Sequence, residues 1–387
     1  MPLFNKKMAL QNAFRHRLRA FLTILGIVIA ILAFGLLRTV VSAWYGGVDA
    51  ASDSRLITRN ATSLVFPLPI SYQHKIRQID GVESVSYANW FGGIYIDERN
   101  FFPNFAVQLD SYLPLYPEFR FDPGQYKALL LNKRGCAVGE KLARRYGWKV
   151  GDVIPLKGTI FPGNYPLVVE AIFSGTRKNT DTNLLLFHWS HLNDRMEKLF
   201  PRRANNTGVF VIGISNPAQA AEIARHIDGE FRNSLAETLT ETEKAFQLSF
   251  VAMTEAIVVA IEAVAYVVIL IIMAVMANTM AMAARERSGE YATLKALGFA
   301  PVVVSWLIVA ESLLLALIGG SIGITLTFPA TASFGQALDN IFPVFNVTTA
   351  TLWLQAGAAL LVGVIAAIVP AIQAARVNIV NGLRAVG

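Results

Sequence analysis

The stretch Asn278–Phe299, NTMAMAARERSGEYATLKALGF, separates two long apolar runs of the chain. It starts as the end of one run, becomes charged from Arg285 onward and finishes at Gly298, with Pro301 opening the next run. A glycine followed by a proline is a stop signal for a helix. The pattern therefore predicts a short helix, apolar on one side and charged on the other, between two membrane-crossing helices.

The apolar residues, 54% of the chain, are concentrated in four runs. Crossing the hydrocarbon core of a bilayer, about 30 Å thick, takes about 20 such residues. The first run is longer than the about 7–15 residues of a signal peptide, so we expect it to be retained as a transmembrane helix. The sequence predicts four transmembrane α-helices, from the runs Phe21–Val41, Ala263–Ala284, Val302–Phe328 and Leu352–Ala375.

The positive charge lies in short segments beside these runs. Cations without acids precede the first run, Arg376 and Arg384 follow the last, and Arg285, Arg287 and Lys295 lie in the central stretch. By the positive-inside rule, these three segments face the cytoplasm. The net charge of +7 then reports topology, and nucleic acid is not needed as a partner.

Residues 1–20 have the pattern of an amphipathic helix on the cytoplasmic surface. Leu10, Phe14 and Leu18 fall on one side, whereas Arg15 and Arg19 point away. Anionic lipid headgroups are sufficient partners for such arginines, so the sequence predicts an anchoring role for them.

Residues 45–250 are numerous enough for a separate domain with its own core. Short alternating strands and helices predict a large α+β extracytoplasmic domain between the first and second transmembrane helices. The expected strands are Glu83–Ala88, Val153–Lys157, Leu167–Phe173 and Val209–Ile214, and the expected helices are Tyr72–Ile79, Gly139–Tyr146 and one from Asn216 to about Arg232.

From about Leu239 to Ala284 no helix breaker occurs. At 1.5 Å per residue, one helix over this span would be about 69 Å long, more than the bilayer needs. We therefore expect a rigid stalk that joins the second transmembrane helix to the outside domain. The predicted segments are 1–20, 21–44 (first span), 45–250, 251–284 (stalk and second span), 285–299, 301–328 (third span), 329–350 (outer loop), 351–376 (fourth span) and 377–387 (cytoplasmic tail).

Candidate chemistry is sparse. No phosphate-binding GxxxxGK[ST] loop is present, so any ATP must be bound by another chain. His188 and His191 lie three residues apart but lack a third ligand, which makes a metal site the weaker interpretation. Glu255 and Glu262 are expected at the outer interface as solvated acids, and Cys136 is expected to be a buried thiol.

Two features of the third run stand out. Glu311 is an acid inside apolar helix, and we weigh a polar contact between helices above a proton or ion pathway. Gly319, Gly320 and Gly323 predict a face for close helix packing.

The chain resembles the MacB/FtsX/LolC-type ABC transporter permeases. The resemblance rests on the layout of one span, a large outside domain and three spans, and on the stretches LRAFLTILGIVIAI, RERSGEYATLKALG, IVAESLLLALIGGSIGI and VPAIQAARVNIVNGLRAVG. In this family the loop after the second span is the coupling helix that docks on a cytoplasmic ATPase. Carried over to this chain, the coupling residues are Arg285, Glu286, Arg287, Glu290, Tyr291, Leu294, Lys295 and Gly298. Where the family commonly has isoleucine and glycine, Tyr291 and Ala292 follow Glu290.

The resemblance implies a non-enzymatic permease subunit of the bacterial cytoplasmic membrane, with both termini in the cytoplasm. Its partners would be an ABC ATPase that holds ATP and Mg²⁺, a second permease copy or paralogue, and a periplasmic adaptor or carrier protein. The outside domain would move for export or extraction of a lipoprotein, lipid, peptide or drug. The alternative is a signalling subunit that activates a cell-wall hydrolase without transport.

Overall fold

The computed structural model describes residues 15–46, 48, 51–177, 180–337, 342 and 345–378. Contacts divide the chain into a helical unit (1–43, 255–337 and 345–387) and a sheet unit (44–254 and 338–344). Most of the amphipathic helix expected over residues 1–20, and most of the tail expected over 377–387, lie outside the described residues.

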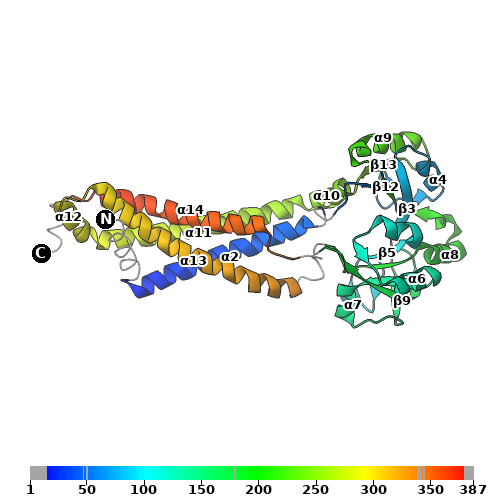
Figure 1. Ribbon diagram of the computed structural model, residues 1–387, viewed down its shortest axis with the longest axis horizontal. Helices are drawn as coiled ribbons and strands as arrows, with labels where there is room; N and C mark the ends of the chain where they lie inside the picture. The colour runs from blue at the N-terminus through cyan, green and yellow to red at the C-terminus, as the bar shows by residue number, and fades with distance from the viewer. Residues whose placement is uncertain are drawn as a thin grey trace. The chain divides into compact units, whose positions relative to one another are not determined.

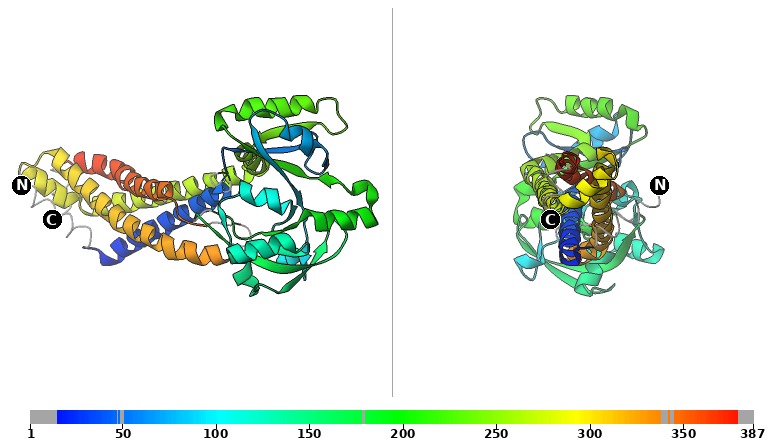
Figure 2. Two further views of the ribbon diagram at one scale, coloured as in Figure 1. Left: turned by 45° about the vertical axis from the view of Figure 1, so that its right-hand side comes forward. Right: turned by 90° about the vertical axis from the view of Figure 1, so that its left-hand side faces the viewer.

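Among the residues that the structure describes, the helical unit has four helices that are long and apolar enough to span a membrane, which confirms the predicted class. They lie side by side in Figures 1 and 2. The third continues beyond the predicted end at residue 328, through Pro329. The long helices are α2 (Arg17–Trp44), α11 (Glu255–Glu286), α13 (Pro301–Ala337) and α14 (Thr349–Ala375), and the short helix α12 (Ser288–Ala296) lies between α11 and α13.

Glycines allow α13 to approach two neighbouring helices closely. A Cβ at Gly319 would lie 2.8 Å from the Cβ of Ile27 on α2, and a Cβ at Gly323 would lie 3.0 Å from that of Ile31. Gly320 instead faces α14, where an added Cβ would lie 2.6 Å from that of Ala359. Close approach through small residues is a common way for helices to associate in a membrane.

The sheet unit is built on a mixed sheet of eleven strands, in the order β13-β1-β12-β3-β5-β10-β7-β9-β8-β4, with β6 paired to β9. Strands β5 and β10 are parallel, as are β7 and β9, and the other pairs are antiparallel. A further pair joins β2 (Leu68–Pro69) to β11 (Asn206–Thr207). The sheet strands are β1 (Arg55–Asn60), β3 (Val82–Trp90), β4 (Ile94–Tyr95), β5 (Asn104–Val107), β6 (Phe119–Arg120), β7 (Gly135–Gly139), β8 (Val153–Gly158), β9 (Gly163–Gly175), β10 (Leu185–His188), β12 (Val209–Ile214) and β13 (Thr238–Thr242).

Two hydrophobic clusters form the core of the sheet unit. Phe91, Tyr165 and Phe187 are buried in one, and Leu109, Leu129 and Phe173 are buried in the other. The strands and helices predicted from alternation and capping are present, which confirms the α+β class. The helices are α4 (Tyr72–Arg77), α5 (Leu109–Tyr112), α6 (Pro123–Leu131), α7 (Glu140–Tyr146), α8 (Trp189–Leu199), α9 (Ala220–Glu230) and α10 (Glu243–Met253), with 3₁₀ turns η1 (Glu98–Asn100), η2 (Leu113–Leu115), η3 (Pro201–Arg203) and η4 (Pro217–Gln219).

The expected uninterrupted helix from Leu239 to Ala284 is wrong. Its first residues belong to edge strand β13, and α10 and α11 are separate helices with Thr254 between them. The Thr254 hydroxyl donates to the carbonyl of Val251 and accepts from the indole N–H of Trp44. Because threonine side chains compete for backbone hydrogen bonds, such a residue can interrupt a helix without glycine or proline. The break falls at the boundary between the two units.

Candidate functional site around helix α12

Helix α12 occupies the middle of the stretch with which the sequence analysis began. Arg285 and Glu286 belong to the end of α11, and Arg287 leaves helical geometry before α12 starts at Ser288. At the other end, Gly298 has a φ of +90°. The N–H of Phe299 donates to the carbonyl of Leu294 at 3.1 Å and that of Gly298 to Lys295 at 3.0 Å, which closes the helix in a Schellman-type turn that favours glycine.

The expected apolar side of α12 is divided between two directions. Tyr291 is fully buried in the core of the helical unit, Leu294 packs at its margin, and Leu297 is 72% exposed. Residues six apart on an α-helix are about 120° apart around the axis, so Tyr291 and Leu297 do not share a face. Tyr291 therefore anchors α12 to its own chain, and burial raises the pKa of its hydroxyl to about 12.

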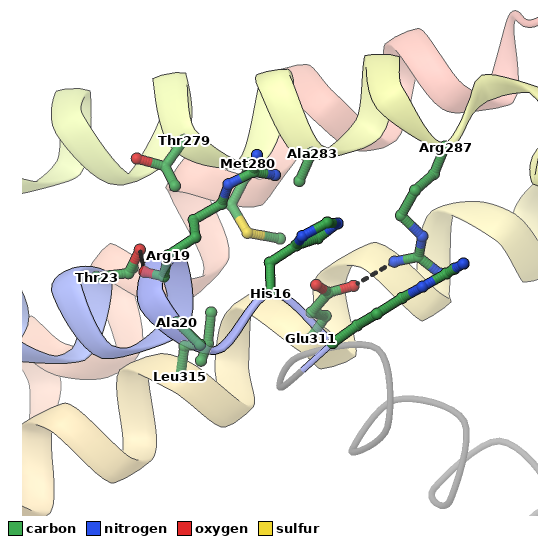
Figure 3. A pocket seen from close by; sticks show the side chains of 11 residues that line it. His16, Arg19, Ala20, Thr23, Thr279, Met280, Ala283, Arg287, Glu311 and Leu315 are labelled. Carbon is green, nitrogen blue, oxygen red and sulfur yellow. Dashed lines mark hydrogen bonds and ion pairs between the residues drawn. The ribbon is translucent and has the colours of Figure 1, made fainter.

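A buried ion pair fixes the start of α12 to α13. The guanidinium of Arg287 donates to Glu311 at 3.0 Å and to Glu290 at 3.1 Å, and it lies 5.4 Å from the ring centre of Tyr291. Figure 3 shows Arg287 and Glu311 pointing toward one another from separate helices. Burial opposes the charge on Arg287, but Tyr291 and the two carboxylates outweigh it and raise its pKa. Glu311 thus makes a polar contact between helices.

The start of the first long helix also binds this region. Arg19 donates two hydrogen bonds to Glu286, at 2.7 and 2.8 Å, and Arg15 pairs with Glu290. Burial acts to raise the pKa of Glu290, but the hydrogen bonds from Arg15 and Arg287 outweigh it and lower that pKa. The expectation that both arginines serve lipid headgroups is corrected, because their partners are carboxylates of the same chain.

A small pocket lined by both charged and apolar side chains lies at the junction of α2, α11 and α13 (Figure 3). It encloses about 30 Å³, which is room for a water molecule or two and too little for a nucleotide. Its charged side chains are engaged in the ion pairs just described. The lining residues are Arg15, His16, Arg19, Ala20, Thr23, Thr279, Met280, Ala283, Arg287, Glu311 and Leu315.

Lys295 ties the end of α12 to the end of α14. Its ammonium donates to the backbone carbonyls of Ala375, at 2.5 Å, and Val377, at 2.9 Å. A cation at the final carbonyls of a helix is favoured by the helix dipole. Helix α12 is therefore held by α13, by α14 and by Arg15, which lies just before α2.

The remaining side of this region faces away from the helical unit. We call it the outer face of α12 and define it as Arg285, Thr293, Ala296, Leu297 and Phe299, all of which are exposed. Of the predicted coupling residues, Arg285 is the one that belongs to the outer face as defined. Arg287, Tyr291 and Lys295 instead contact other helices or the core of the helical unit.

The other candidates do not converge on a site. The Nε2–H of His188 donates to the carbonyl of Leu129 at 2.7 Å, and the described residues contain no group of three potential metal ligands. Cys136 is buried, which raises the pKa of its thiol.

Sequence reasoning missed two polar contacts between the long helices. Glu262, expected to be a solvated acid, pairs with Arg38 on α2. Their positions were the available signal. Arg38 lies near the C-terminal end of the first apolar run and Glu262 just before the N-terminal end of the second, and two successive membrane spans bring these ends to the same side. The buried Gln355 was also missed; its amide donates to the carbonyl of Ile31 at 2.9 Å and the hydroxyl of Thr327 at 2.8 Å.

Comparison with known families gives two matches. Residues 20–229 match the MacB-like periplasmic core domain, and residues 262–379 match the FtsX-like permease C-terminal region. The first match alone covers more than half of the chain. The two matches together cover most of both units.

Two curated relatives are each 26% identical to the chain. The uncharacterized ABC transporter permease MJ1507 of Methanocaldococcus jannaschii aligns over 97% of this chain and 96% of its own length. The uncharacterized ABC transporter permease protein Rv0987 of Mycobacterium tuberculosis aligns over 66% of this chain but only 30% of its own length.

Among solved structures, the periplasmic region of MacB from Actinobacillus actinomycetemcomitans covers 52% of this chain at 8% identity, with a TM-score of 0.39. The extracellular domain of the noncanonic ABC-type transporter YknZ from Gram-positive bacteria covers 49% at 10% identity, with a TM-score of 0.35. The match covers 95% of the MacB chain and 100% of the YknZ chain.

Proposed function

Since this chain belongs to the MacB/FtsX-type family of ABC transporter permeases, we propose that it couples ATP hydrolysis by a separate cytoplasmic ATPase to movement of its sheet unit. In this proposal the chain lies in the cytoplasmic membrane with both termini inside, and the sheet unit lies outside. ATP and Mg²⁺ belong to the ATPase, and a second permease copy or a paralogue completes the assembly.

The observation that carries the proposal is the two-sided construction of α12. One side is fixed to α13 through Arg287, to α14 through Lys295 and to the core of the helical unit through the buried Tyr291, while the outer face leaves Leu297 in solvent. A helix held this firmly passes a force applied to its outer face directly to the membrane helices. Exposed apolar side chains beside a charged rim are typical of a protein-binding surface.

Replacement of Leu297 tests this surface. We expect Leu297→Asp in the tagged full-length chain to abolish copurification of the co-expressed ABC ATPase, because it places a charge in an apolar contact. Leu131→Asp is the matched control, since Leu131 is a similarly exposed leucine, at 77%, on α6 of the sheet unit. Unchanged ATPase recovery with Leu297→Asp would refute docking at the outer face.

Arg287 is unsuitable for such a test. Reversal of its charge would place a new carboxylate beside those of Glu290 and Glu311 and disturb the helical unit itself. Loss of ATPase binding would then have two explanations.

The proposed output is export or extraction of a substrate from the outer side of the membrane. A lipoprotein, lipid, peptide or hydrophobic drug fits this output, with a periplasmic adaptor or carrier protein as a further partner. Measuring the release of each class from proteoliposomes that contain the permease and its ATPase selects among them. ATP-dependent release that is lost with Leu297→Asp would identify the substrate class.

A further inference from the structure

Within the sheet unit, a single buried arginine joins three separate segments of the chain. Arg55, the first residue of β1, is 5% exposed. Its Nε donates to Glu243 at 2.8 Å, and its terminal nitrogens donate to Glu118 at 2.6 and 3.1 Å and to the carbonyl of Leu115 at 2.7 Å. Its guanidinium also lies 4.2 Å from the ring centre of Tyr116.

Glu243 is the first residue of α10, the helix from which the chain continues into α11. Its side chain is almost fully buried and also accepts from the N–H of Ser52 at 2.8 Å. The carboxylate therefore has several donors and fixes the first turn of α10 to the start of β1. Hydrogen bonds between ionised groups in a buried setting are about twice as strong as neutral ones.

The partner on the other side is a segment that crosses the sheet. We call Leu113–Phe119 the strap. Leu115 lies over β12, where a Cβ at Gly213 would be 2.7 Å from its Cδ2, and Phe119 pairs with Gly175 on β9. Strands β1 and β9 are six positions apart in the sheet order. The strap thus connects two strands that are not neighbours.

Aromatic rings continue this connection. Tyr116 stacks on Phe119 with ring centres 5.5 Å apart, and Phe119 lies 4.8 Å from Phe173 on β9. Leu113 of the strap and Leu109 of α5 are buried in one cluster with Phe173 on β9 and Val211 on β12. The contacts run without interruption from Arg55 to the far half of the sheet.

We infer that Arg55 is a positioning residue that transmits displacement of α10 through the strap to the β9 half of the sheet. The inference rests on the proposed function for the source of the displacement, but the junction itself is a property of the sheet unit. A pull on Glu243 is delivered to Glu118 through one guanidinium, instead of being dispersed through six strand pairings.

Hydrogen exchange of the full-length chain in detergent, without ATPase, tests the junction. We expect Arg55→Met to accelerate amide exchange about tenfold or more in both the strap and the first turn of α10, because it leaves the buried carboxylate of Glu243 and the partly buried carboxylate of Glu118 without their shared donor. The control is Arg59→Met, on the same strand, whose Nε donates to Glu241 at 3.1 Å. It is expected to affect only β1 and β13, and an unchanged strap in Arg55→Met would overturn the inference.

Glu118→Gln provides a milder variant that retains Arg55 and Glu243. It is expected to accelerate exchange in the strap while leaving the first turn of α10 as in the wild type. If the strap does not respond, the junction does not work as inferred, whereas a response of both segments would show that a change at Glu118 reaches α10 through Arg55. Neither outcome depends on the ATPase, so failure of the proposed function would leave this result standing.

Discussion

Arg287 shows how one side chain stabilises the region that we propose to be the coupling site. It pairs with Glu311 on α13 and with Glu290 on α12, and it is almost fully buried. Breaking a buried ion pair on one side leaves an uncompensated charge, whereas replacing both partners with apolar residues is often neutral.

We therefore expect Arg287→Met to destabilise the full-length chain by about 3–5 kcal/mol and Arg287→Met with Glu311→Leu to recover most of that loss. Unfolding of the chain in detergent, followed by intrinsic fluorescence, gives the comparison. A double variant no more stable than the single one would show that the pair does not act as a unit.

His191 gives the sheet unit a dependence on pH. Burial lowers the pKa of its imidazole below the ordinary value, and the charge of Arg195 adds to this effect. Below about pH 6.5, His191 is therefore protonated in the unfolded chain before it is protonated in the folded chain. The stability contributed by neutral His191 is fully present above that pH and decreases as the pH falls toward the lower, folded-state pKa.

Melting temperatures of the sheet unit within the full chain, measured between pH 7.5 and 5, check this sign. We expect His191→Gln to flatten the decrease seen in the wild type. An equally steep decrease in the variant would assign the acid sensitivity to other groups.

At the scale of elements, the packing of α13 on α2 depends on two glycines. Gly319→Ala would bring a methyl group to 2.8 Å from the Cβ of Ile27, so the helices must separate. Overpacking of this kind typically costs about 1–3 kcal/mol. Gly357→Ala on α14 is the control, because nothing lies within 4 Å of an added Cβ there.

Melting temperatures of the two variants in detergent are expected to differ by several degrees, with Gly357→Ala at or above the wild type. If Gly319→Ala were as stable as its control, close α2–α13 packing would not hold the helical unit together.

The elements were predictable where a single physical signal dominated. Apolar length located the four long helices, alternation located β3, an apolar run located β12, and the Gly298 stop located the end of α12. The break at Thr254 was not predictable, because a threonine interrupts a helix only when tertiary partners such as Trp44 engage its hydroxyl.

The candidate site was predicted as a stretch but not as a set of contacts. Charge and the helix stop placed α12, yet Arg15 binds Glu290 on α12 and Arg19 binds Glu286 at the end of α11, from 275 and 267 residues away in sequence. Such pairs depend on how the long helices pack, and periodicity within one helix carries no information about that. For the same reason Tyr291 could not be recognised as an internal anchor.

In the whole molecule, α12 follows α11 and α10 directly along the chain, and α10 follows the last strand of the sheet unit. The joint at Thr254 replaces the rigid stalk expected from the sequence. In the proposed coupling, the anchored first turn of α10 and Arg55 would carry force to the sheet without a straight rod.

The most direct test of the central claim is hydrogen exchange of the full-length permease, bound to its ATPase, in ADP and in Mg-ATP with vanadate. We expect amide exchange to differ between the two nucleotide states both around α12 and in α10 and the strap. Leu297→Asp should remove both differences. Nucleotide-dependent change confined to residues around α12, with α10 and the strap identical in the two states, would contradict coupling of the ATPase to the sheet unit.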